Sequence, residues 1–132
     1  MIDSVKIDIL NFDGNQWLHN SLLEFHVYTN TRTGELGNKL VAKYRGLKFI
    51  LRESSMCSGA YNCSIEGSLH KYFNRGRNNT TDFDIGQLQD AILEIQKKFN
   101  VDPNLAILRN LEVGINLNVP LSAGELIGNL VA

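Results

Sequence analysis

One stretch of the sequence combines several residue types that bind nucleic acids. Residues 70–79 read HKYFNRGRNN. Lys and Arg side chains neutralise phosphates, and the glycine within the run lets backbone amides approach a ligand. Tyr72 and Phe73 are adjacent, so in an extended segment one faces inward and the other outward, available to stack on a base. The alternative is an ordinary surface, with a core Phe, an exposed Tyr and solvated charges.

The positive charge of the chain is concentrated in its middle third. The formal net charge is only −1. Residues 32–77 nevertheless carry nine Lys and Arg against three acidic residues, and the rest of the chain carries four against eleven. This asymmetry favours one surface that binds a polyanion, although charge also fluctuates along sequences without function. The predicted nucleic-acid-binding residues are Lys43, Arg45, Lys48, Arg52, Lys71, Tyr72, Arg75 and Arg77.

A metal site is a second candidate, on the polar sides of two predicted strands. Alternation over 64–70 places Glu66 and His70 on one side, and alternation over 107–119 places Glu112 and Asn116 on another. If the two strands share a sheet, these four side chains can converge on a hard or borderline divalent ion. The alternative is that polar residues on the exposed side of a sheet have no function.

Several enzyme classes and locations are disfavoured by the sequence. It contains no G-x-x-x-x-G-K loop, no H-E-x-x-H and no G-x-S-x-G motif. Cys57 and Cys63 are the only cysteines, and no sequence pattern places a histidine base beside either. The first residues do not form a signal peptide and no apolar run is long enough to span a membrane, so we expect a cytoplasmic protein with free thiols.

One helix is strongly predicted, over residues 85–99. Asp84 is a plausible N-cap, with Gln87 at the capping-box position. The apolar residues then recur at helical spacing, which indicates a helix packed on the core rather than a site. The members of this stripe are Ile85, Leu88, Ala91, Ile92, Ile95 and Phe99.

The other elements read as strands. Alternation predicts strands at 3–10 and 22–29, a hairpin over 39–53 that turns at Arg45-Gly46, and a strand that begins near Tyr61. The segment 107–119 predicts a long central strand with one face in the core, and a short closing helix is expected around 123–130. The chain is therefore expected to be one α+β domain over 1–132, an antiparallel sheet of about five strands with the 85–99 helix packed on one face.

Three blocks of this sequence resemble a known family. GSLHKYFN (67–74), NNTTDF (78–83) and NLEVGIN (110–116) are similar to segments in the N-terminal half of phage and plasmid rolling-circle replication initiators, the gene-two-type phage replication proteins. The resemblance runs in order over about residues 1–120. It implies an origin-binding protein whose relatives nick one DNA strand with a metal ion and a tyrosine that becomes linked to the 5′ phosphate.

The resemblance also assigns residues. It implies His70 and Glu112 as metal-side residues with Asn116 nearby, Mg²⁺ or Mn²⁺ as the metal, and 71–77 as a contact to nucleic acid. The chain departs from the family in length, because initiators are usually much longer and their nucleophilic tyrosine is expected in the part that is lacking here. We therefore expect a domain that binds DNA or RNA without cleaving a strand on its own.

An alternative hypothesis follows from the same departure. A short, phage-encoded relative can act as an inhibitor of a host defence ribonucleoprotein, such as a CRISPR effector, in the host cytoplasm. It would bind the RNA or the effector protein. The predicted partners are thus DNA or RNA, or a host ribonucleoprotein, and no membrane.

Overall fold

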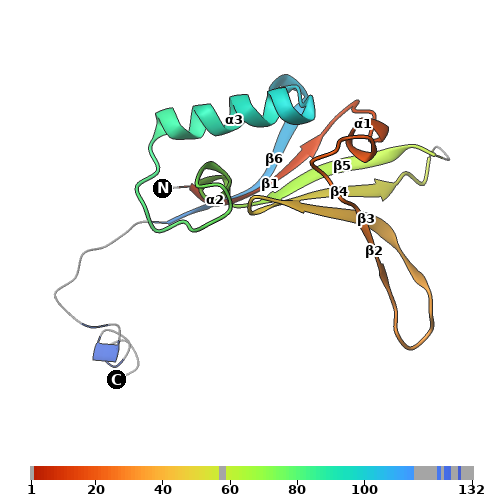
Figure 1. Cartoon of the computed structure of the whole chain (residues 1–132), viewed down its shortest axis with the longest axis horizontal. Coiled ribbons are helices and arrows are strands. Elements are labelled where there is room, and N and C mark those ends of the chain that lie inside the picture. The colour runs from red at the N-terminus through yellow and green to blue at the C-terminus, as the bar shows by residue number, and fades with distance from the viewer. Residues whose placement is uncertain (1, 57–58, 115–121, 123, 126–127, 129–132) are drawn as a thin grey trace.

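A computed structural model describes residues 2–56, 59–114, 122, 124–125 and 128, and within them the chain forms a single antiparallel sheet (Figure 1). The spatial order is β2-β3-β4-β5-β1-β6. The α+β prediction is confirmed, with six strands rather than about five. The strands are β1 (Ile2–Ile9), β2 (His26–Thr29), β3 (Leu36–Tyr44), β4 (Leu47–Glu53), β5 (Tyr61–Gly67) and β6 (Ala106–Val113).

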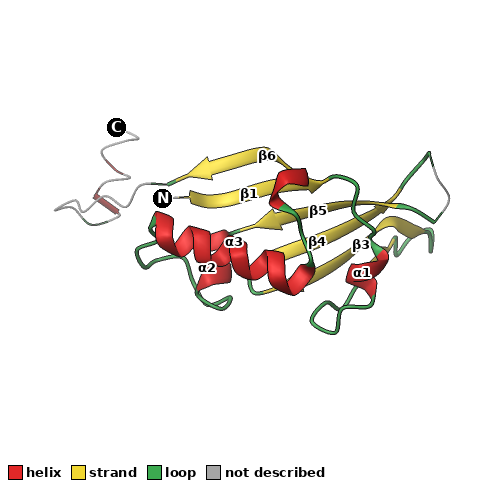
Figure 2. Cartoon of the chain, turned by 90° about the horizontal axis from the view of Figure 1, so that it is seen from above, coloured by secondary structure: helices red, strands yellow, loops and turns green. Residues whose placement is uncertain are grey.

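The helices lie on one face of the sheet (Figures 1 and 2). They are α1 (Asn15–Leu18), α2 (Leu69–Phe73), α3 (Ile85–Phe99) and the short 3₁₀ helix η1 (Pro103–Leu105). The predicted main helix is confirmed as α3, including its capping box between Asp84 and Gln87. Asn100 ends it in the left-handed conformation, which Asn tolerates better than most residues. No helix in the described ranges is long and apolar enough to cross a membrane.

The core lies between the sheet and these helices, and aromatic rings fill its centre. Phe49 of β4 contacts Phe99 of α3 and Trp17 of α1, with ring centroids 4.5 and 5.1 Å apart. Trp17 is fully buried, and its indole N–H donates to the carbonyl oxygen of Phe99 at 3.0 Å. This pairing satisfies the polar atom of the ring while its apolar area stabilises the fold.

The predicted 64–70 strand is wrong in its last three residues. β5 ends at Gly67, and Ser68 caps α2 by accepting the Lys71 amide. Gly67 has φ 134°, and a Cβ there would lie 2.3 Å from the Gly46 carbonyl oxygen. The close approach of the β3–β4 turn therefore requires glycine at this position and redirects the chain into a helix. His70 lies on α2 rather than on a strand.

The predicted central strand at 107–119 is also corrected. Its described part, β6, is an edge strand beside β1. Leu108, Leu111 and Val113 are 53%, 43% and 64% exposed, because the alternation of apolar residues does not decide whether an element covers the strand. Residues 115–119 lie outside the described residues, as does most of the closing helix predicted at 123–130.

Candidate nucleic-acid interface

The sheet has one face without helices, which we call the open face. The register of β3, β4 and β5 divides their residues between the two faces. Leu47, Phe49 and Leu51 point toward the helices and are buried in the core cluster. The alternate residues therefore point to the open face. Across β3 and β4 these are the pairs Lys39–Arg52, Val41–Ile50 and Lys43–Lys48.

Two of these three cross-strand pairs place like charges directly opposite one another. Lys39 faces Arg52, and Lys43 faces Lys48. None of the four forms an ion pair with another residue in the described part of the chain. Opposed like charges destabilise a sheet. We call these four residues the basic half of the open face.

The remainder of the open face is electrically balanced. Lys6 Nζ lies 3.4 Å from Glu66 Oε1, and Arg109 Nε lies 2.7 Å from Asp8 Oδ2. These four residues come from β1, β5 and β6, and we call them the paired half. The charges of the paired half are therefore neutralised within the protein. Among the described residues the basic half forms no ion pair, although Glu66 lies opposite Lys48 in the β4–β5 register.

Apolar residues run between the charged rows of the basic half. Val41 and Ile50 are 6% and 3% exposed, although no helix lies on this face. Neighbouring side chains on the sheet must shield them, and the long stems of Lys43 and Lys48 are beside them in the register. The exposed surface of the basic half is therefore formed by the charged side chains, with Val41 and Ile50 buried beneath them.

An exposed aromatic residue, Tyr28, adjoins the basic half. It lies on β2, is 57% exposed, and lines a hollow of about 480 Å³ together with His26, Val41 and Lys43. The predicted set does not contain Tyr28. In the sequence, alternation over 22–29 places Tyr28 on the side opposite Leu23, Phe25 and Val27, and this pattern is the signal that could have identified it.

The predicted basic residues separate into two places. Lys43, Lys48 and Arg52 lie on the open face, as described above. Arg45, Lys71, Arg75 and Arg77 lie at the end of the sheet, where the loop after α2 packs on the β3–β4 turn. A Cβ on Gly76 would lie 3.0 Å from the Arg45 Cα, so the loop and the turn are in direct contact.

The Arg45 side chain already interacts with other residues of the protein. Its Nη1 lies 3.3 Å from Glu94 Oε1, and its guanidinium lies 5.0 Å from the centroid of the Tyr44 ring. Arg75 and Arg77 are exposed. The end of the sheet is therefore a mixed surface, in which α3 contributes carboxylates, rather than an extension of the basic half.

Tyr72 is wrong as a base-stacking residue. Its side chain is fully buried, 6.2 Å from the Tyr44 ring, because α2 turns it into the core. Burial, and then the Glu94 carboxylate, raises the pKa of its hydroxyl well above the usual range. Phe73 is half-buried, with its ring 5.8 Å from that of Phe83. Neither ring offers a free face to a base.

The predicted metal ligands are not assembled in the described residues. His70 is fully buried, its Nε2 lies 3.1 Å from the Thr81 hydroxyl, and its ring stacks on Phe83 at 4.8 Å. Glu112 lies on β6 opposite Ser4, and Asn116 is outside the described residues. No three His, Cys, Asp or Glu side chains of the described ranges form a metal-ligand group. The metal site stays a prediction without support from the fold.

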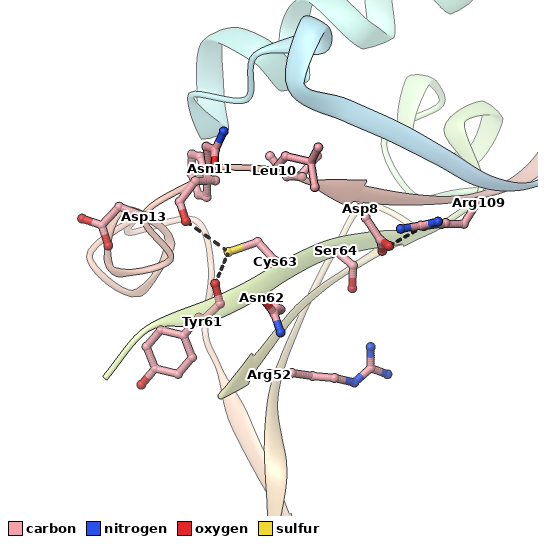
Figure 3. Close-up of a pocket in the computed structure, with 12 residues that line it drawn as sticks. Asp8, Leu10, Asn11, Asp13, Arg52, Tyr61, Asn62, Cys63, Ser64 and Arg109 are labelled. Atoms are coloured by element: carbon pink, nitrogen blue, oxygen red, sulfur yellow. Dashed lines mark hydrogen bonds and ion pairs between the residues drawn. The ribbon is translucent and has the colours of Figure 1, made fainter. Parts of the chain in front are cut away.

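A polar cleft of about 750 Å³ adjoins both halves of the open face (Figure 3). Arg52 and Asn62 line it from β4 and β5, and the Asp8–Arg109 ion pair lines it from β1 and β6. The Ser64 hydroxyl also lines it, is buried, and has no hydrogen-bond partner in the described part of the molecule.

Cys63 borders the same cleft but is not a nucleophile at neutral pH. Its Sγ faces the carbonyl oxygens of Phe12 and Tyr61 at 3.9 and 3.8 Å (Figure 3). Burial, and then the Asp13 carboxylate, raises the pKa of the thiol to about 12. The reactive thiolate is therefore scarce near pH 7. Cys57 lies outside the described residues.

Comparisons with protein-family models, with curated proteins and with solved structures find no significant match to this chain.

Proposed function

We propose that this chain binds single-stranded DNA or RNA along the open face of its sheet. The observation that carries the proposal is that two like-charged pairs, Lys39–Arg52 and Lys43–Lys48, lie opposite one another in the register on a face that no helix covers. A phosphate backbone across β3 and β4 relieves the repulsion in both pairs and releases its own counterions.

A single strand fits this surface better than a duplex does. Single-strand-binding domains combine a basic surface that follows the backbone with aromatic rings on which bases stack. The basic half supplies the charges, and Tyr28 supplies an exposed ring beside Lys43. Within the described residues, neither α2 nor α3 projects from the open face, where a duplex groove would have to receive it.

Binding without strand cleavage is part of the proposal. The resemblance to rolling-circle initiators favours a replication context, and strand nicking in those proteins uses a tyrosine beside a metal. Here His70, which the resemblance implies as a metal-side residue, is buried against Thr81 and Phe83. Incubation of supercoiled plasmid with the protein and Mg²⁺ or Mn²⁺ checks this point, and a relaxed product that is lost in Glu112→Ala would contradict it.

The main test is a salt titration of binding to labelled single-stranded DNA, single-stranded RNA and duplex DNA of equal length. We expect a single strand to bind most tightly, with an affinity that falls steeply as salt rises, since each phosphate contact adds about 0.7 to the logarithmic salt slope for single strands. Absence of binding at low salt would refute the proposal, and a protein-directed role such as the inhibitor of a host ribonucleoprotein would replace it.

A further inference from the structure

We infer that the cleft between Arg52 and Arg109 holds the phosphate of one nucleotide of the bound strand. This inference deepens the proposed function and rests on it for the source of the phosphate. Arg52 belongs to the basic half and also lines the cleft. A nucleic-acid backbone that binds along the basic half and crosses β4 therefore reaches the cleft at Arg52.

The two arginines that line the cleft come from strands that are not neighbours. Arg52 lies on β4 and Arg109 on β6, with β5 and β1 between them, a span of about 14 Å at the usual strand spacing. The Nε of Arg109 donates to Asp8 Oδ2, which fixes the side chain and leaves its terminal N–H groups to a ligand. The planar fork of a single guanidinium matches the geometry of a phosphate.

Ser64 gives an independent indication that the cleft is built for a polar ligand. Its side chain is 4% exposed, and its Oγ has no hydrogen-bond partner among the described residues. Buried hydroxyls in folded proteins are nearly always hydrogen-bonded. The hydroxyl lies between the two arginine-bearing strands, opposite Ile50 and Asp8 in the register. A phosphate oxygen in the cleft provides the acceptor that the protein does not.

The two acidic residues of the cleft, Asp8 and Asp13, lie apart from one another. Asp8 is neutralised by Arg109. The Asp13 carboxylate accepts bonds from the backbone N–H and the side-chain amide of Asn15, both at 3.0 Å, and points away from the Asp8–Arg109 pair (Figure 3). The volume of about 750 Å³ lies in the range of small-molecule sites and exceeds the needs of a bare phosphate. A nucleotide fits, with the Asn62 amide beside it to contact the sugar or base.

The test uses calorimetry with a nucleoside 5′-monophosphate, the matching nucleoside, and inorganic phosphate. We expect the monophosphate to bind at least about tenfold more tightly than the nucleoside. Arg52→Gln should lower the affinity for the monophosphate by about tenfold, and this change removes no ion pair in the described chain. Lys97→Gln is the matched control, an exposed lysine on α3 outside the cleft, and should leave monophosphate affinity unchanged.

Ser64→Ala gives a readout that a purely structural role would not produce. We expect this substitution to lower the affinity for the monophosphate several-fold. The melting temperature should stay equal or rise, because an unpaired buried hydroxyl is removed. Amide resonances of Asn62 and Ser64 should shift when the monophosphate is added. Equal monophosphate affinity in wild type, Arg52→Gln and Ser64→Ala would overturn the inference.

The two proposals fail in distinguishable ways. If oligonucleotides bind but no monophosphate binds, the cleft inference is wrong and the proposed function stands. If the monophosphate binds and shifts the cleft residues but oligonucleotides bind no more tightly, the proposed function is wrong and the cleft is a site for free nucleotides. If inorganic phosphate binds as tightly as the monophosphate, the nucleotide assignment is wrong.

Discussion

The basic half and the paired half of the open face are neighbours on one sheet, yet they treat charge in opposite ways. In the paired half each cation has a carboxylate, Lys6 with Glu66 and Arg109 with Asp8. In the basic half cations face cations. An exposed ion pair contributes about 0–1 kcal/mol, and a directly opposed like-charge pair costs a similar amount. The basic half therefore lacks stability that the paired half has, and the proposed binding of a polyanion offers a reason for that difference.

The largest expected effect is the loss of two cations from the basic half. Lys43→Gln combined with Lys48→Gln should lower single-strand affinity on the order of 50-fold at about 50 mM salt. It should also reduce the logarithmic salt slope by about 1.4, since two contacts are lost. Fluorescence anisotropy across a salt series measures both quantities.

The matched control for this variant is Lys97→Gln, an exposed lysine on α3. This control also removes positive charge, but on the face of the molecule that carries the helices, and it should leave the logarithmic salt slope of binding unaltered. The double variant should also unfold at higher urea than wild type, because a repulsive pair has been removed. Equal losses in the variant and the control would mean that binding follows net charge and not the open face.

Tyr28 comes next in expected size. Tyr28→Ala should lower single-strand affinity by about tenfold, because stacking of one base on an aromatic ring contributes about 1–3 kcal/mol. Tyr28→Phe keeps the ring and should bind as wild type does. The same anisotropy assay decides the matter, and a loss in both variants would assign the effect to the hydroxyl instead of stacking.

In the paired half a much smaller change is expected. Lys6→Gln should alter single-strand affinity less than about twofold, since Glu66 already neutralises this lysine. It should lower the free energy of unfolding by a few tenths of a kcal/mol. A double-mutant cycle with Glu66→Gln isolates the pair. If Lys6→Gln weakens binding as much as Lys43→Gln does, the distinction between the two halves is false.

Cys63, which is buried in the core between the sheet and the helices, leads to a prediction about stability at high pH. The pKa of Cys63 is raised from 9.0 to about 12 in the folded state. Its protonated thiol thus contributes stability that is fully present below pH 9 and lost as pH rises from 9 toward 12. In Cys57→Ser, which leaves Cys63 as the sole thiol, labelling at pH 8 should be far slower than for a free thiol. Rapid labelling of the folded protein would contradict the burial.

The sequence predicts local features of this fold better than distant ones. Asp84, Gln87 and the apolar stripe predict α3 well because capping and helical periodicity depend on neighbouring residues. Alternation also separates Lys43, Lys48 and Arg52 from the core side of the hairpin. The helical position of His70 depends on the contact between Gly67 and the β3–β4 turn. No short-range pattern contains that contact.

The errors in the candidate site have the same origin. Tyr72 was predicted as exposed because an extended segment was assumed, and α2 buries it. The ligand set of Glu112 and His70 assumes that the two predicted strands are adjacent. β5 and β6 share a sheet, but β1 lies between them, and His70 lies on α2. The cleft joins residues from β1, β4, β5 and β6, so only the assembled sheet brings Asp8, Ser64 and Arg109 together.

The position of β1 has a consequence for how the chain assembles. β1 precedes the other strands of the sheet along the chain, yet it lies between β5 and β6, and Ile7 pairs with Ile65 and Leu108. Both partners follow it by many tens of residues. Such long-range pairing slows folding, because the intervening chain must be ordered before the contacts form. β1 therefore leaves the ribosome with both edges unsatisfied, and the cleft that it lines exists only after the last strand has docked.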